Sequence, residues 1–105
     1  MKDKNIQEIQ FLEQGLQNIL FQKQAFHMEL SETKEALKEL ESAKDEVFKI
    51  IGQIMIKSDK AKMKEELLSK VKIFELRIKE LEKQENSLSD RIEKIRDEDL
   101  KNSKS

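Results

Sequence analysis

Apolar residues recur at alternating spacings of three and four along two long stretches of the chain. The first stretch runs from Ile9 to Leu40 and the second from Leu67 to Asp99, and eight of the ten positions at this spacing are apolar in each. A mean repeat of 3.5 residues is typical of the seam of a coiled coil, so we predict two long helices. The seam positions are Ile9, Leu12, Leu16, Ile19, Lys23, Phe26, Leu30, Thr33, Leu37 and Leu40, then Leu67, Val71, Phe74, Ile78, Leu81, Glu85, Leu88, Ile92, Ile95 and Asp99.

The segment between the two stretches, residues 46–57, has a period close to two and is rich in β-branched side chains. This pattern predicts two strands joined by a tight turn at Gly52 and Gln53. Counting alternate residues straight through the segment gives two faces. One face, which we expect to be buried, holds Phe48, Ile50, Gly52, Ile54 and Ile56. The other holds Lys49, Ile51, Gln53, Met55 and Lys57.

The two predicted helices are nearly equal in length and are joined by a short connection, so they should fold back on each other. We therefore predict a mainly α fold, an antiparallel coiled-coil hairpin with one short β-hairpin, as a single domain over residues 1–105. The expected bounds are about 5–44 for the first helix, 46–57 for the β-hairpin, 59–100 for the second helix and 101–105 for a polar tail. Ser58 or Asp59 should cap the start of the second helix. The charged seam residues Lys23 and Glu85 should lie within a layer or so of each other, but the sequence leaves open whether they touch.

The amino-acid composition argues against several classes of protein. Charged residues make up 41% of the 105 residues and hydrophobic residues only 36%, with no proline, which argues against a compact globule with one ordinary hydrophobic core. A net charge of −1 argues against nucleic-acid binding. The chain has no cysteine and no apolar run of about 18 residues, so we expect a cytoplasmic protein that does not enter membranes.

Residues that could support catalysis are scarce. His27 is the only histidine, and no glycine-rich phosphate loop is present. Ser31 and Lys34 fit the S-x-x-K pattern of serine acylases, but they lie within a predicted continuous helix. We predict a protein that is not an enzyme and has no catalytic residues, metal site or cofactor.

The predicted β-hairpin indicates how the protein assembles. An isolated two-stranded hairpin is marginally stable in water, and this one would expose a concentration of apolar side chains. Burying four of them is worth roughly 6 to 12 kcal/mol. We therefore expect an oligomer joined through the hairpin, with an interface of Val47, Phe48, Ile50, Ile51, Gly52, Ile54, Met55 and Ile56.

The hairpin segment also carries a family resemblance. Phe48-Lys49, then Ile50-Ile51-Gly52, then an apolar strand from Ile54 to Lys57, set between two heptad helices, resembles the β-type subunits of archaeal prefoldin. The resemblance implies an ATP-independent chaperone (holdase), a hexamer of two α-type and four β-type subunits with a β-barrel body. It also implies that the coiled-coil ends bind unfolded proteins, prevent their aggregation and deliver them to a group II chaperonin.

By chain order those ends are roughly Met1–Leu16 and Leu88–Ser105. The residues expected to bind clients are Ile6, Ile9, Phe11, Leu12, Ile95 and Leu100. Leu20, Phe21 and Met28 also lie off the seam and would contact either clients or a neighbouring helix. An alternative function is a structural or adaptor coiled coil, which would bind one defined folded partner and no denatured proteins.

Overall fold

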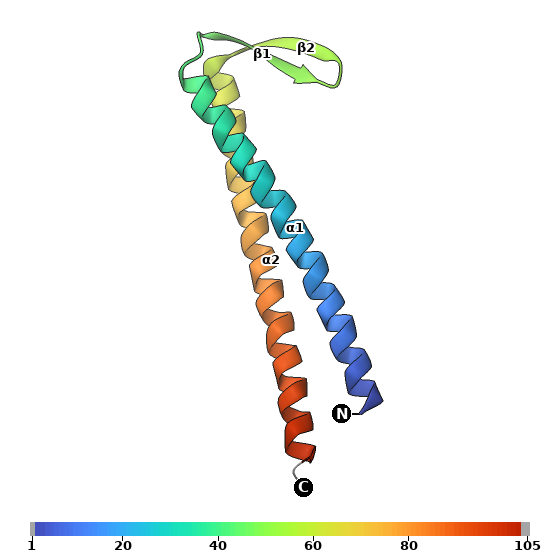
Figure 1. Ribbon diagram of the computed structural model, residues 1–105. Helices are drawn as coiled ribbons and strands as arrows, with labels where there is room; N and C mark the ends of the chain where they lie inside the picture. Colours follow the sequence, from blue (N-terminus) through green and yellow to red (C-terminus); the bar gives the residue numbers. More distant parts are fainter. Residues whose placement is uncertain (1, 104–105) are drawn as a thin grey trace. The chain divides into compact units, whose positions relative to one another are not determined.

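The computed structural model describes residues 2–103 and is mainly helical, as predicted (Figure 1). In chain order it contains helix α1 (Asp3–Glu41), strands β1 (Glu46–Ile51) and β2 (Ile54–Asp59), and helix α2 (Lys60–Ser103). Helix α1 ends at Glu41 rather than near residue 44. Helix α2 runs to Ser103, so the part of the expected polar tail that the structure describes is helical. Met1, Lys104 and Ser105 lie outside the described residues.

The start of α2 and the end of α1 are closed by neighbouring polar groups. The Lys62 backbone N–H donates to Asp59 Oδ1 at 2.7 Å, so Asp59, rather than Ser58, is the N-cap. Lys60 Nζ donates to the carbonyls of Glu41, at 2.9 Å, and Ala43, at 3.3 Å. The final carbonyls of a helix have no partner within the helix itself. Here the first residue of α2 supplies a hydrogen bond to the last residue of α1 and a second one to Ala43, just beyond the helix.

Strands β1 and β2 form an antiparallel hairpin, in which Glu46 faces Asp59 and Ile51 faces Ile54. Gly52, in the turn between them, has φ of 60°, a conformation that favours glycine. Each even-numbered residue of β1 therefore lies opposite an odd-numbered residue of β2.

This register shows that the predicted division of the hairpin into two faces was wrong. Residues directly opposite each other in a pair of strands point to the same side, whereas the two turn residues do not continue the alternation. The first face holds Glu46, Phe48, Ile50, Met55, Lys57 and Asp59. The second face holds Val47, Lys49, Ile51, Ile54, Ile56 and Ser58.

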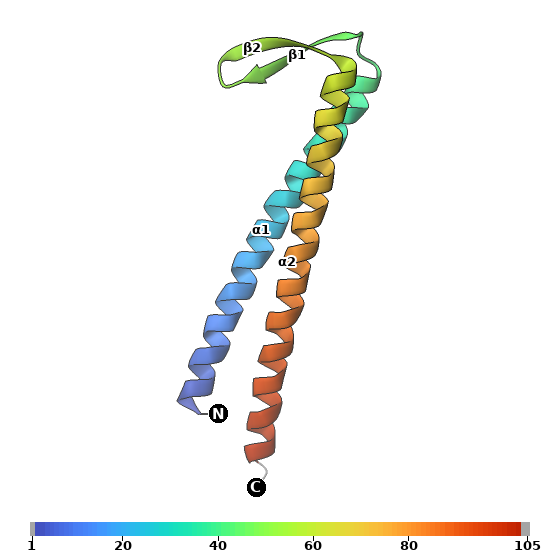
Figure 2. The same ribbon diagram turned by 180° about the vertical axis from the view of Figure 1, so that it is seen from behind.

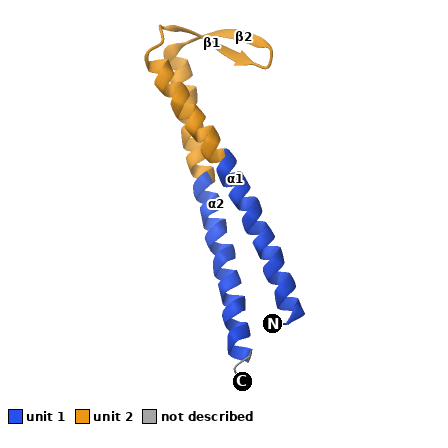
Figure 3. Ribbon diagram, in the orientation of Figure 1, with its two compact units in different colours: residues 1–25, 78–105 blue, residues 26–77 orange. Residues whose placement is uncertain are grey.

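The chain divides into two compact units, coloured separately in Figure 3. Unit 1 comprises residues up to 25 and from 78 onward, and unit 2 comprises residues 26–77. Within each unit α1 and α2 run side by side in opposite directions, as the two views show (Figures 1 and 2). All twenty predicted seam residues are buried or half-buried, which confirms the heptad phase.

Each unit has its own seam contacts. In unit 1, Ile9, Leu12, Ile92 and Ile95 form a buried cluster, against which Leu16 and Leu88 pack. In unit 2, the rings of Phe26 and Phe74 are 6.1 Å apart between centroids and tilted by 41°.

The charged seam residues of unit 1 form an ion pair. Lys23 Nζ lies 3.1 Å from Glu85 Oε1, and both side chains are half-buried. The structure thus answers the question that the sequence left open. A paired charge within an apolar seam fixes the register of two helices, since any shift would leave each charge among apolar neighbours.

Candidate functional site

The β-hairpin carries a large exposed apolar surface. The structure places all eight predicted interface residues in the two strands and their turn. Apart from Gly52 and the half-buried Val47, these residues are large hydrophobics that remain 44% to 69% exposed, and they lie on both faces. Such a surface is typical of an interface with another chain.

The second face of the hairpin is held against its own helix α2. The three partly buried residues of the hairpin, Val47, Lys49 and Ser58, all lie on this face. Lys49 Nζ donates to Glu66 Oε2 at 2.8 Å. This hydrogen bond, together with the nearby lysine charges, lowers the pKa of Glu66 below its ordinary value.

The first face is exposed along its whole length. Phe48, Ile50 and Met55 are 59%, 69% and 64% exposed there. They are bordered by an exposed ion pair of Lys57 Nζ and Glu46 Oε1 at 2.7 Å. The first face is therefore an apolar patch with a charged border, an arrangement that protein interfaces share.

The predicted client-binding residues lie together in unit 1 but fall into two classes. Phe11 and Leu100 are 74% and 60% exposed, and Ile6 is 38% exposed. Ile9, Leu12 and Ile95 are only 6%, 6% and 8% exposed because they form the seam. An unfolded chain can reach the first class directly, but it can reach the second class only where the two helices separate.

A polar layer lies next to the buried cluster, at the end of unit 1. Asn5 Nδ2 donates to Asp99 Oδ1. Asp99 Oδ2 is buried without a hydrogen-bond partner within residues 2–103, which costs about 1–3 kcal/mol. This end of the seam is therefore weaker than the apolar layers beside it. Sequence reasoning missed Asn5, although continuing the seam spacing back from Ile9 would have identified it.

Two exposed ion pairs flank the same end. Arg91 Nη2 lies 3.0 Å from Glu8 Oε1, and Arg96 Nη2 lies 2.9 Å from Glu13 Oε1. Exposed pairs of this kind contribute little to the free energy of unfolding. Their main effect is therefore on how the two helices align.

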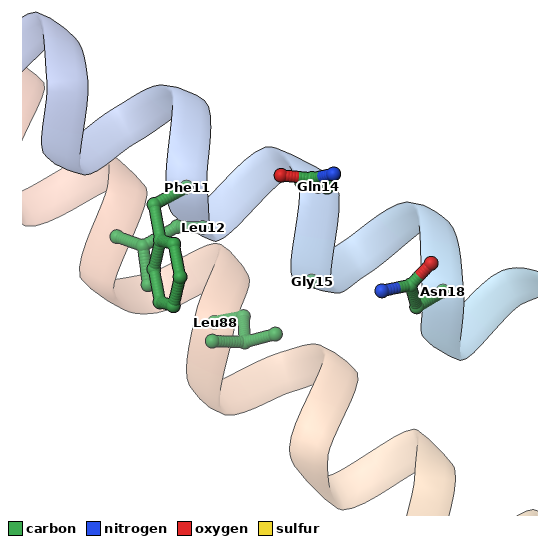
Figure 4. A pocket seen from close by; sticks show the side chains of 6 residues that line it. All are labelled: Phe11, Leu12, Gln14, Gly15, Asn18 and Leu88. Carbon is green, nitrogen blue, oxygen red and sulfur yellow. The ribbon is translucent and has the colours of Figure 1, made fainter.

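A hollow of about 150 Å³ opens on the surface of unit 1 beside Gly15. It is lined by Phe11, Leu12, Gln14, Gly15, Asn18 and Leu88 (Figure 4). A Cβ at Gly15 would lie 3.3 Å from Leu88 Cδ1, so the missing side chain also lets Leu88 approach. Sequence reasoning missed this feature. The signal was a glycine inside a helix, where it costs about 1 kcal/mol relative to alanine.

Within residues 2–103, His, Asp and Glu side chains form no group of three or more that could hold a metal ion. None of the helices in that range has the length and apolarity needed to cross a membrane.

Comparison with known proteins identifies the family. The family model described as "Prefoldin subunit" matches residues 3–102. The chain belongs to the prefoldin family. Prefoldin subunits are non-enzymatic chaperone subunits that form hetero-oligomeric complexes with one another. The predicted family and the predicted absence of enzyme activity are thereby confirmed.

Relatives of this prefoldin chain include β-type subunits from archaea. Prefoldin subunit beta of Thermococcus onnurineus is 37% identical over 90 residues, which cover 84% of this chain and 78% of the relative. The Archaeoglobus fulgidus protein of the same name is 36% identical over 89 residues, covering 83% and 77%. The crystal structure of the prefoldin beta subunit from Thermococcus strain KS-1 has a TM-score of 0.84 at 33% identity, covering 90% of this chain and 85% of that one. This match confirms the predicted fold class.

Proposed function

We propose that this prefoldin subunit is part of an ATP-independent holdase in the cytoplasm. It binds unfolded proteins at the ends of its helices, prevents their aggregation and delivers them to a group II chaperonin. The observation that carries the proposal is the pair of exposed apolar side chains, Phe11 and Leu100, beside a buried apolar cluster in unit 1. Such residues supply the non-directional contact that a binder of diverse unfolded chains needs.

Client binding in this proposal depends on several weak contacts. A fully buried apolar side chain contributes about 1.5–3 kcal/mol, and a side chain at a helix end contributes less because it stays partly in water. In a hexamer of two α-type and four β-type subunits, several helix ends act on one client. Linked sites of this kind raise avidity by about 10² to 10⁴ over a single contact.

Assembly in this proposal depends on the β-hairpin. Its exposed apolar side chains and unpaired strand edges would be covered by the hairpins of neighbouring subunits in a shared β-barrel. The first face is the better candidate for the barrel interior, because the second face already contacts α2 through Lys49 and Glu66. The interface and the client-binding end then lie in different units, so they can be tested separately.

The test is suppression of aggregation by the subunit assembled with its α-type partner. A chemically denatured enzyme is diluted into the assembly, and light scattering is recorded with and without deletion of residues 1–11 and 97–105. We expect the truncated assembly to keep its size in sedimentation and to lose protection of the enzyme.

Two outcomes would count against the proposal. Equal protection by the truncated and full-length assemblies would show that the helix ends are not the client-binding site. Saturable binding to one folded protein, with no binding to varied denatured ones, would favour the adaptor function instead.

A further inference from the structure

The part of α1 from Gln14 to Ala25 is nearly free of charge. Between Gln14 and Ala25 the only charged residue is Lys23, which is half-buried in the seam and paired with Glu85. In contrast, 14 of the 26 residues from Ile78 to Ser103 are charged. In a chain with 41% charged residues, this stretch of α1 provides an uncharged surface beside the predicted client-binding residues.

The hollow at Gly15 lies on this surface. None of the six residues that line it is charged. Figure 4 shows Phe11 and Asn18 on either side of Gly15 along α1, with Leu88 opposite on α2. Leu12 and Leu88 provide apolar walls, and Gln14 and Asn18 add exposed amide groups.

We propose that the hollow at Gly15 binds one large apolar side chain of an extended client segment, while the amides of Gln14 and Asn18 hydrogen-bond the client backbone. This inference rests on the proposed function and names the feature of the client that is recognised. The uncharged lining matches an uncharged occupant, since a charged group would lose its hydration there without a partner. A volume of about 150 Å³ suits one side chain rather than a helix.

The amides at the rim favour an extended chain over a folded partner. A carboxamide offers both donors and an acceptor, and an extended segment has backbone N–H and C=O groups that lack partners. The backbone groups of a packed helix are already hydrogen-bonded within that helix. Gln14 and Asn18 would therefore contribute little to contact with a second coiled coil.

A second exposed phenylalanine predicts the distance between two large apolar side chains in a client segment that binds well. Phe21 is 63% exposed on the same helix, ten residues beyond Phe11. At about 1.5 Å per residue the two lie about 15 Å apart along the helix, which an extended chain spans in about four to five residues. Segments with two large apolar side chains at that separation should bind most tightly.

The test compares two substitutions of the same chemistry on the same helix. Gln14→Glu puts a carboxylate at the rim of the hollow, whereas Gln17→Glu makes the same change at an exposed position that does not line it. The probe is a fluorescein-labelled, uncharged peptide with two phenylalanines four residues apart, and its anisotropy is titrated against the full-length chain. We expect Gln14→Glu to weaken binding about tenfold or more and Gln17→Glu to change it by less than about twofold, because only the first carboxylate must lose water on binding.

A second arm reports on the hollow directly. The chain contains neither Trp nor Tyr, so the emission of a Phe11→Trp variant arises from position 11 alone. Addition of the peptide should shift this emission to shorter wavelength as water leaves the ring. A peptide with its two phenylalanines adjacent should bind several times more weakly than the spaced peptide.

Each other outcome would overturn the inference. Equal losses for Gln14→Glu and Gln17→Glu would show a general charge effect, and no loss for either would show that the hollow takes no part. A change of oligomer size in sedimentation for Gln14→Glu alone would assign the hollow to contact with a second copy. The terminal truncation separates this inference from the proposed function. If truncation abolishes protection while Gln14→Glu binds the peptide normally, the helix ends hold clients without the hollow.

Discussion

Removal of the Phe74 side chain should destabilise unit 2, and the loss in free energy of unfolding depends on how deeply the side chain is buried. A phenylalanine truncated in a fully closed core costs about 3–5 kcal/mol, but Phe74 is only half-buried. Half of that range is about 2 kcal/mol, and loss of its tilted contact with Phe26 adds about 0.5–1.5 kcal/mol. We therefore expect Phe74→Ala to lower the free energy of unfolding by about 2.5–3.5 kcal/mol.

The measurement is thermal melting of the helical circular-dichroism signal at a fixed protein concentration. For a chain of this size, 1 kcal/mol corresponds to about 4–8 °C in Tm, so Phe74→Ala should lower Tm by about 10 °C or more. The matched control is Ile73→Ala, because Ile73 is the neighbouring residue on α2 and is 54% exposed. If Ile73→Ala lowers Tm as much as Phe74→Ala does, the heptad phase argued from the seam is incorrect.

Three further predictions test the hairpin, the charged seam layer and the pH dependence. The double substitution Ile50→Asp and Met55→Asp places two charges on the first face. Sedimentation should then show loss of the hetero-oligomer, while the helical circular-dichroism signal persists. A complex of full size would exclude this face from the interface. Lys23→Ala leaves Glu85 half-buried and unpaired and should destabilise unit 1 by about 1–3 kcal/mol, whereas replacing both residues by Leu should restore stability or raise it in urea unfolding. Because the folded-state pKa of Glu66 lies below its ordinary value of 4.5, its ion pair stabilises the chain above that pH and loses its effect as pH falls through the folded pKa. The Tm difference between wild type and Glu66→Gln should accordingly be constant from pH 6 to 8 and shrink in acid, and a difference that persists at pH 2 would contradict the assignment.

The seam could be predicted because it depends only on spacing. A repeat of 3.5 residues leaves one choice of apolar face on each helix, and near-equal helix lengths bring Lys23 and Glu85 to corresponding levels. The spacing also gave Asp99 as a seam position. Its partner Asn5 was missed because the apolar pattern stops at Ile9 and a polar residue beyond it gives no hydrophobic signal.

The faces of the hairpin could not be obtained by counting. Alternation holds within a strand, but the relation between the strands depends on how many residues the turn takes. With Gly52 and Gln53 in the turn, Ile50 shares a face with Met55 rather than with Ile54. The hollow at Gly15 was also beyond the sequence pattern, because it depends on the side chain of Leu88 from the other helix.

The hydrogen bond from Lys60 to the end of α1 bears on the order in which parts of the chain fold during synthesis. The carbonyls of Glu41 and Ala43 receive hydrogen bonds from a residue that follows 19 and 17 positions later, so α1 leaves the ribosome before its end is closed. The hairpin and unit 2 pair residues that lie closer along the chain than those of unit 1, such as Phe26 with Phe74, and shorter loops cost less entropy to close. The Asn5–Asp99 layer, whose partners are 94 positions apart, cannot form until Asp99 has been synthesised. Unit 2 therefore closes before the Asn5–Asp99 layer, which lies at the end proposed to hold unfolded clients.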